Sequence, residues 1–356
     1  MHLSEKAKII AQALDLQPLN LNEAEFLYNN SSFAELMFVA NEIRKKIHPT
    51  NIVSYIIDRN INLSNICISN CLFCNFCRSK NSKESYILKI SDYIKKIDKL
   101  YQLGGNQILL QGGIHHDLNL QFYKTLFSDL KKHYPNLKLH ALGPAEIVFI
   151  SKQAGLTYKD TLLELINAGL DSLPGAGAEI LSDRVRKIIS PTKCTSDEWL
   201  DVMQAAHKIG LTTSATMMFG HIETLHEKIE HLIKIRNLQD SKPKNSVGFI
   251  SFTLWPLAGT NTRLLKKFPQ IKPVSNTEFL KMLSFSRIML PNIKNIQTSW
   301  LTMGNEIAKI CINGTAGNHL SVKTTITNGS AITDKPTMAG KIKSDMIPIE
   351  RLIMLF

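Results

Sequence analysis

The chain has 356 residues, which is enough for one large α/β barrel or for two smaller domains with cores of their own. Its 44% hydrophobic and 20% charged residues are ordinary for a globular protein, and no apolar run reaches the roughly 18 residues that a membrane span needs. The net charge of +12 comes from dispersed lysines without interleaved aromatic residues, so we expect neither a nucleic-acid partner nor a membrane span.

The first 47 residues have the apolar spacing of helices, with one break at Pro18. His48-Pro49 ends this pattern, because a residue before proline avoids helical backbone angles. The pattern predicts an N-terminal helical cap over residues 1–50. The opening residues carry charges but no apolar segment with a cleavage site, so we expect no secretory signal and a cytoplasmic location.

After the cap, short segments that are apolar, or that alternate between apolar and polar residues, are each followed by a segment with helical spacing. Strands are expected at 61–66, 107–111, 137–142, 172–173, 212–219, 248–254 and 296–300. Helices are expected at 91–103, 120–133, 158–168, 197–209, 226–239 and 276–290. This alternation predicts an α/β fold with a parallel (β/α) barrel, complete or nearly complete and similar to a TIM barrel. Residues 51–305 would form its core, and residues 306–356 the last barrel unit and a C-terminal tail.

Glycine-containing segments follow several of the expected strands. They are Gln111-Gly112-Gly113, Pro174-Gly-Ala-Gly177 and Gly220. In parallel α/β folds the loops after the carboxyl ends of the strands build the active site. We therefore expect these segments to meet at one mouth of the barrel.

Four of the six cysteines fall within eleven residues, directly after the first expected strand. A disulfide framework is disfavoured, because it needs an oxidising compartment and usually a smaller chain. The spacing Cys67-x3-Cys71-x2-Cys74 suits three thiolates that hold three irons of a cubane cluster and leave the fourth iron open. An open iron is what a catalytic centre needs.

Cys77 gives a second register of three cysteines, Cys71-x2-Cys74-x2-Cys77. A closed cluster or a zinc site is therefore an alternative. A closed site would take its remaining ligand from elsewhere, and only Cys194 and Cys311 remain, each without a neighbouring ligand pair. The sequence therefore favours an open cluster on Cys67, Cys71 and Cys74, and it assigns no role to Cys77.

The chain resembles the radical S-adenosylmethionine superfamily, and within it the cyclic dehypoxanthinyl futalosine synthase family of menaquinone biosynthesis. The resemblance extends in order through about two thirds of the chain. Its segments are Asp58-Arg-Asn-Ile-Asn62, Gln111-Gly-Gly-Ile-His115, His140-Ala-Leu-Gly-Pro-Ala-Glu146, Asp171-Ser-Leu-Pro-Gly-Ala-Gly-Ala-Glu-Ile-Leu181, Arg184-Val-Arg186, Ser190-Pro-Thr-Lys193, Ala206-His-Lys-Ile-Gly210 and Ala215-Thr-Met-Met-Phe-Gly-His-Ile-Glu-Thr224.

The resemblance implies a reaction and its cofactors. S-adenosylmethionine chelates the open iron of a [4Fe-4S] cluster, and an electron from an external donor such as flavodoxin or ferredoxin cleaves it to a 5′-deoxyadenosyl radical. That radical abstracts a ribose hydrogen from the small-molecule substrate dehypoxanthinyl futalosine. The ribosyl radical then adds to the aromatic ring, and loss of an electron and a proton gives a spirocyclic product.

Other functions stay open at this point. Aminofutalosine synthase and the deazaflavin-core synthases of coenzyme F420 biosynthesis share the implied fold and cluster, and Asp58 before Arg59-Asn60 favours the cyclase. A non-catalytic iron–sulfur sensor is a third possibility. Gln111, Glu179 and Glu223 at strand ends argue against a sensor, because a sensor needs no cofactor pocket.

The resemblance also implies roles for single residues. Phe73 would pack near adenine or fill the core, and Gln111-Gly112-Gly113 would receive the methionine amino group or form a tight turn. Glu179 would bind the ribose hydroxyls or stabilise a helix N-terminus. Arg184 and Arg186 would hold a carboxylate of cofactor or substrate, or form surface ion pairs.

A ring closure that ends in proton loss needs a base. His140, Glu146, His221 and Glu223 all lie at or just beyond strand ends, and a histidine or carboxylate suits this task. We favour His221 and Glu223, because Gly220 opens space beside them.

The end of the chain departs from the cyclase pattern. Where that family has acidic residues near its last strand, this sequence has Gly314-Thr-Ala-Gly-Asn-His-Leu320 and Thr324-Thr-Ile-Thr-Asn328. The departure concerns substrate contacts on the last strands and not the cluster.

Overall fold

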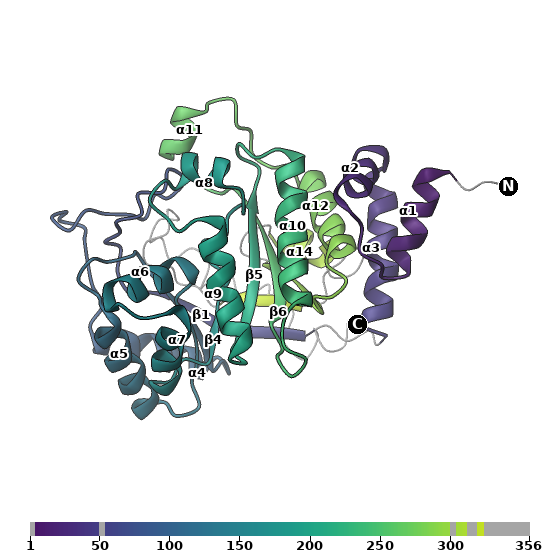
Figure 1. The fold of residues 1–356 in the computed structure, drawn as a ribbon. Helices are drawn as coiled ribbons and strands as arrows, with labels where there is room; N and C mark the ends of the chain where they lie inside the picture. The colour runs from purple at the N-terminus through teal and green to yellow at the C-terminus, as the bar shows by residue number, and fades with distance from the viewer. Residues whose placement is uncertain (1–3, 50–53, 300–303, 312–318, 324–356) are drawn as a thin grey trace.

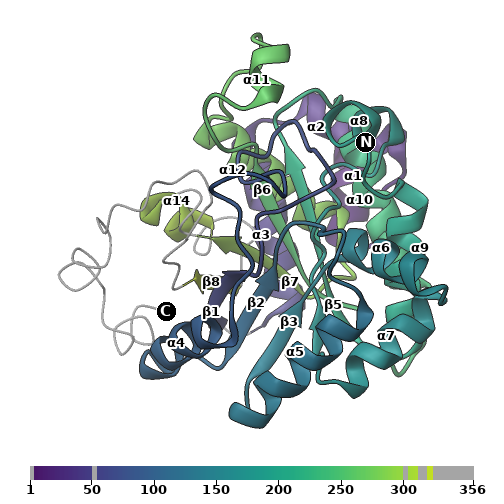
Figure 2. The same cartoon turned by 90° about the vertical axis from the view of Figure 1, so that its left-hand side faces the viewer.

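The computed structural model describes residues 4–49, 54–299, 304–311 and 319–323 (Figure 1). Eight parallel strands close into a barrel in the order of the chain, with β8 hydrogen-bonded to β1 (Figure 2). The strands are β1 (Ser54–Asn62), β2 (Gln107–Gln111), β3 (Lys138–Ala141), β4 (Ser172–Leu173), β5 (Thr212–Phe219), β6 (Phe249–Pro256), β7 (Asn295–Ser299) and β8 (His319–Lys323). The expected parallel (β/α) barrel is confirmed, and it is complete.

Three helices precede the barrel: α1 (Glu5–Leu14), α2 (Leu21–Asn30) and α3 (Phe33–Ile47). Asn20 and Ser32 begin the second and third with reciprocal capping boxes, which satisfy backbone N–H groups at both starts. The three helices lie beside α10 and α12 on one side of the barrel, with α3 against α12 and α2 against α10 (Figure 1). The domain division at residue 50 stays a prediction.

Further helices surround the barrel and link its strands (Figures 1 and 2). They are α4 (Ile90–Gln102), α5 (Leu120–His133), α6 (Pro144–Ala154), α7 (Tyr158–Asn167), α8 (Asp183–Ile189), α9 (Ser196–Lys208), α10 (Leu225–Asp240), α11 (Arg263–Lys267), α12 (Asn276–Met289) and α14 (Asn305–Ile310). In the part of the chain that the structure describes, no helix combines the length and apolar character of a membrane span.

Several elements differ from the sequence predictions, and the short helices α8, α11 and α14 were not among the expected ones. The first strand covers Ser54–Asn62 and not 61–66, so the residues from 63 onward belong to a long loop. Helix α6 was not predicted, because its apolar residues are nearly continuous and hide a helical period. Pro144 at its first turn and left-handed Gly155 after its end are the signals that mark it.

Many polar side chains line the barrel interior, because alternate residues of each strand point to the axis. In β2, Ile108 and Leu110 are fully buried against the helices, whereas Gln107 and Gln111 point to the barrel axis. The axis holds a cavity of about 520 Å³. Its lining includes further polar side chains from β4 to β7, among them Ser172, Ser214, Thr216, Ser251, Thr253 and Gln297. Many barrels of this type are packed with branched apolar residues, so this interior is suited to a ligand.

Two buried histidines predict acid sensitivity of the fold. Burial lowers the pKa of His207 to about 4 and that of His231 to about 3. His207 Nε2 lies 2.8 Å from Thr213 Oγ1, and its ring packs on Phe249. Below pH ~6.5 these two histidines become protonated in the unfolded chain but stay neutral in the folded chain. The free energy of unfolding therefore falls as the pH drops toward 4.

We expect His207 to contribute about 2 kcal/mol to the loss of unfolding free energy between pH 7.5 and pH 5. His207→Gln removes that contribution, which urea unfolding at the two pH values measures. His133→Gln, on an exposed histidine, is the matched control. An unchanged pH dependence in His207→Gln would contradict the prediction.

Candidate active site

A long loop between β1 and α4, residues 63–89, carries the clustered cysteines. Backbone hydrogen bonds fix it to the end of β2: Leu63 N–H donates to Gln111 O over 2.8 Å, and Gly113 N–H donates to Ser64 O over 2.8 Å. Ile68 N–H donates to Ile114 O over 3.0 Å. The loop therefore lies across the carboxyl mouth of the barrel, above the cavity.

Cys67, Cys71 and Cys74 are free thiols in this loop. The Cys71 thiol is 6% exposed, and burial raises its pKa to about 11, with smaller contributions from Cys67 and Cys74. Ser69 N–H donates to Cys67 Sγ over 3.4 Å, which suits a thiolate acceptor.

The described residues do not form a site for a single metal ion. In the described part of the chain, no three His, Cys, Asp or Glu side chains converge as ligands of one metal ion. A cubane binds each thiolate at a different iron, so its cysteines need not converge on one point. Cys77 lies beside the set, and its thiol donates to Cys67 O over 3.3 Å.

Gly112 and Gly113 allow the cysteine loop to approach β2. A Cβ at Gly113 would lie 2.1 Å from Ile66 O and 2.8 Å from Cys67 Cβ, and one at Gly112 would lie 2.9 Å from Leu63 Cγ. Neither glycine has a positive φ, so a tight left-handed turn is not the reason for them. The close approach of two backbones is the reason.

Gly113→Ala is expected to displace the cysteine loop and to lose most of the iron after anaerobic reconstitution. The added methyl meets backbone atoms, which cannot rotate away, and overpacking of this kind costs about 1–3 kcal/mol. Iron and sulfide content measures the effect. The control is Gly104→Ala, where the backbone has φ +78° but no atom lies within 4 Å. Full iron content in Gly113→Ala would refute the assigned role.

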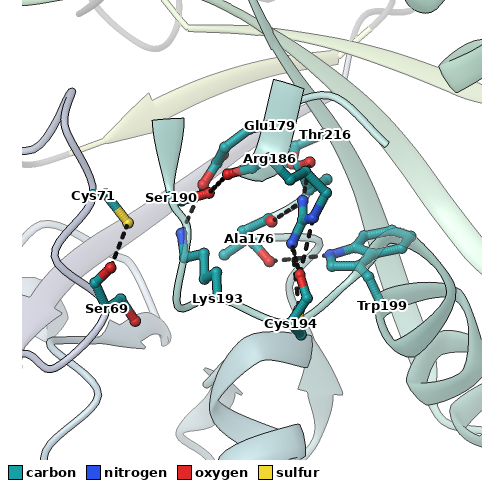
Figure 3. A network of polar contacts seen from close by, with 12 residues as sticks. Ser69, Cys71, Ala176, Glu179, Arg186, Ser190, Lys193, Cys194, Trp199 and Thr216 are labelled. Carbon is teal, nitrogen blue, oxygen red and sulfur yellow. Dashed lines mark hydrogen bonds and ion pairs between the residues drawn. The ribbon is translucent and has the colours of Figure 1, made fainter. Parts of the chain in front are cut away.

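A buried lysine connects the cysteine loop with the loop after β4 (Figure 3). Lys193 Nζ donates to Glu179 Oε1 over 2.7 Å and lies 5.7 Å from the centre of the Phe73 ring. Its charge lowers the pKa of Cys71, against the larger effect of burial, and holds the pKa of Glu179 below its usual value. Burial raises the pKa of Glu146 to about 7, and the Lys193 charge opposes this rise. Glu179 lines the cavity, and its φ of +43° is unusual for a residue with a side chain.

The two arginines of the segment Arg184-Val-Arg186 take different positions. Arg186 is buried and donates to three backbone carbonyls, Gly177 O, Ala178 O and Cys194 O, so it holds the glycine-rich loop in place (Figure 3). Arg184 is half exposed and forms a two-pronged ion pair with Glu227, with Nε 2.8 Å from Oε1. It does not line the cavity.

His221 and Glu223 form a closed turn after β5. The Glu223 carboxylate accepts the backbone N–H groups of Gly220 and His221 over 2.6 and 2.9 Å. His221 Nδ1 lies 2.9 Å from Glu223 Oε2, and the two side chains are 0% and 2% exposed. Neither lines the cavity. The choice of either as base stays a prediction.

His140 and Ser172 face each other across paired positions of β3 and β4 and line the cavity. His140 Nδ1 lies 2.7 Å from Ser172 Oγ. The sequence analysis placed His140 at a strand end among four candidates and favoured His221 and Glu223 over it. The alternation of the strands, with the polar residues of β2 to β7 on one face, is the signal that selects it and that identifies the rest of the lining.

Comparisons with known proteins agree with this geometry. Residues 61–235 match the radical SAM superfamily, and residues 246–336 match the CofH/MqnC C-terminal region. A cyclic dehypoxanthine futalosine synthase of Halalkalibacterium halodurans is 36% identical over 304 residues, which cover 85% of this chain and 80% of that protein. A 5-amino-6-(D-ribitylamino)uracil–L-tyrosine 4-hydroxyphenyl transferase of Methanosarcina mazei is 37% identical over 281 residues, or 78% of this chain and 71% of that protein.

Solved structures share the fold. Methylornithine synthase superposes with a TM-score of 0.70 at 16% identity, covering 92% of this chain and 90% of that one. The hydrogenase maturase HydG of Carboxydothermus hydrogenoformans gives 0.69 at 17% identity, covering 95% and 77%.

The protein is thus an enzyme that starts radical chemistry at an iron–sulfur cluster. It belongs to the radical S-adenosylmethionine superfamily, and its cofactors are a [4Fe-4S] cluster and S-adenosylmethionine.

Proposed function

We propose that the protein converts dehypoxanthinyl futalosine to cyclic dehypoxanthinyl futalosine in menaquinone biosynthesis. Relatives with the cyclase name and relatives with the transferase name match at similar identity, so identity alone does not choose between them. The choice depends on what the barrel can hold.

The size and chemistry of the cavity carry the proposal. Its volume of about 520 Å³ is in the lower half of the range of ligand pockets, which extends from about 300 to 1,000 Å³. That space suits one substrate beneath the cofactor, as the cyclase needs, whereas the transferase named above joins two substrates. The lining of serine, threonine and glutamine side chains offers hydrogen bonds to the hydroxyls of a ribose.

The residues divide into three groups in this proposal. Cys67, Cys71 and Cys74 hold the cluster, whose bound S-adenosylmethionine supplies the 5′-deoxyadenosyl radical. Gln111, Gly112, Gly113 and Glu179 hold the cofactor, and Phe73 packs near its adenine. Arg184 acts through Glu227 to fix the start of α8. An external one-electron donor, such as flavodoxin or ferredoxin, works in a reducing cytoplasm.

A product assay tests the proposal. The anaerobically reconstituted enzyme is given S-adenosylmethionine and a reductant, with dehypoxanthinyl futalosine in one reaction and with L-tyrosine plus 5-amino-6-(D-ribitylamino)uracil in another. We expect a cyclic product that has lost two hydrogens in the first reaction only. A joined product in the second reaction would overturn the proposal in favour of the transferase.

A further inference from the structure

The cavity places one histidine beneath the cofactor end of the barrel. His140 pairs with Leu109 of β2, two residues before Gln111 at the mouth. A strand rises about 3.3 Å per residue, so His140 lies about 7 Å deeper than Gln111. A substrate held between the cofactor and the lower barrel would meet this imidazole.

Few groups in the cavity can take a proton. Among the described lining residues, the side chains with an ordinary pKa below or near neutrality are Asp58, His140 and Glu179. Glu179 is bound by Lys193 over 2.7 Å, and this ion pair opposes its protonation. Asp58 is 4% exposed, whereas His140 is only partly buried.

The partner of His140 suits a group that gains a proton. Ser172 Oγ lies 2.7 Å from Nδ1, and when it accepts the Nδ1–H of the neutral ring, Nε2 is the basic nitrogen. The same hydrogen bond persists after Nε2 gains a proton. The other described histidines near strand ends have different surroundings. His221 is enclosed by Glu223, and His115 is 2% exposed and receives Asp117 N–H on Nδ1.

We propose that His140 is the catalytic base of the ring closure and that Ser172 is its positioning residue. The inference rests on the proposed function. After the 5′-deoxyadenosyl radical has taken a ribose hydrogen, the ribosyl carbon forms a bond to the aromatic ring and leaves a ring radical. His140 would take the proton from the ring carbon, and the bound cluster, oxidised on cleavage of the cofactor, would supply the acceptor for the electron. The substrate thus loses two hydrogens, one in 5′-deoxyadenosine and one on His140.

The test compares product with cofactor cleavage in the full-length reconstituted enzyme. For His140→Ala we expect 5′-deoxyadenosine from dehypoxanthinyl futalosine at close to the wild-type rate, while cyclic product forms at least about 100-fold more slowly. Added imidazole is expected to restore product in His140→Ala, which a merely structural defect would not allow. Ser172→Ala should lower the product per 5′-deoxyadenosine, and Ser172→Thr, which keeps the hydroxyl, should restore it.

The outcomes separate the two ideas. If the wild-type enzyme makes no cyclic product, the proposed function is wrong. The role of His140 as base then falls with it, because there is no ring closure from which to take a proton. If the wild type makes product and His140→Ala does so equally well, only the base assignment is overturned. Product loss in His221→Gln or Glu223→Gln without loss in His140→Ala would move the base to that turn. Loss of product without rescue by imidazole would also overturn the assignment. His133→Gln, on the surface, should behave as the wild type does.

Discussion

Exchanging Cys71 for serine is expected to abolish radical formation. Cys71 is the most buried of the three cysteines in the spacing Cys67-x3-Cys71-x2-Cys74, and a hydroxyl is a poor replacement for a thiolate at iron. Iron and sulfide content should fall sharply after reconstitution. The rate of 5′-deoxyadenosine formation should fall by at least about 10⁶-fold, to below detection, because the enzyme no longer catalyses cleavage of S-adenosylmethionine.

Cys77→Ser is the matched control for this prediction. Cys77 lies in the same loop with its thiol on Cys67 O, yet the cluster assignment does not use it. Its serine variant should retain the iron, the sulfide and the cofactor cleavage of the wild type. If Cys77→Ser lost the cluster and Cys71→Ser kept it, the ligand set would have to be changed to the second register.

Exchanging Lys193 for methionine is expected to destabilise the mouth of the barrel. The side chains of Lys193 and Glu179 are 14% and 12% exposed, and removing one partner leaves the other charge buried and unpaired. Such a loss typically costs about 3–5 kcal/mol of unfolding free energy. We expect a cost in this range from urea unfolding, together with weaker binding of S-adenosylmethionine, since Glu179 loses the contact that orients it.

A double-mutant cycle isolates the pair. Lys193→Met combined with Glu179→Gln removes both charges, so the double variant should be more stable than the sum of the single effects predicts. Lys187→Met, which removes an exposed lysine of α8, should change stability by no more than about 0.5 kcal/mol. Additive effects of Lys193→Met and Glu179→Gln would show that the two side chains do not stabilise each other.

Much of the fold could be predicted because its signals are local. The alternation of segments predicts a parallel barrel, and the helices expected at 197–209 and 226–239 are present as α9 and α10. The structure shows that Thr195 and Thr224 cap their starts. The extent of β1 could not be read locally. Its pairing with β8 and β2 is set by residues far away in the chain, and this pairing starts the strand at residue 54.

The position of the cysteine loop could be predicted because it lies within one segment of the sequence. The contacts between segments that are distant in the sequence could not be predicted. The cysteine loop is a single motif, so its place after the first strand follows from the sequence. Lys193 is fourteen residues from Glu179 and more than a hundred from Phe73, and only the fold brings them together. The expected role of Arg184 in ligand binding stays a prediction, and its ion pair with Glu227 of α10 could not be read from the sequence.

The altered segments near the end of the chain lie mostly outside the described residues. Of 314–320 and 324–328, only His319 and Leu320 are described, as part of β8. The described lining of the cavity comes from β1 to β7 and from the loop after β4, and these residues carry the proposal.

Isotope transfer tests the central claim most directly. Dehypoxanthinyl futalosine with a deuterated ribose is given to the reconstituted enzyme, and the 5′-deoxyadenosine is analysed by mass spectrometry. We predict that 5′-deoxyadenosine gains one deuterium for each cyclic product formed. 5′-Deoxyadenosine that stays free of deuterium while the substrate is consumed would contradict radical ring closure in this cavity.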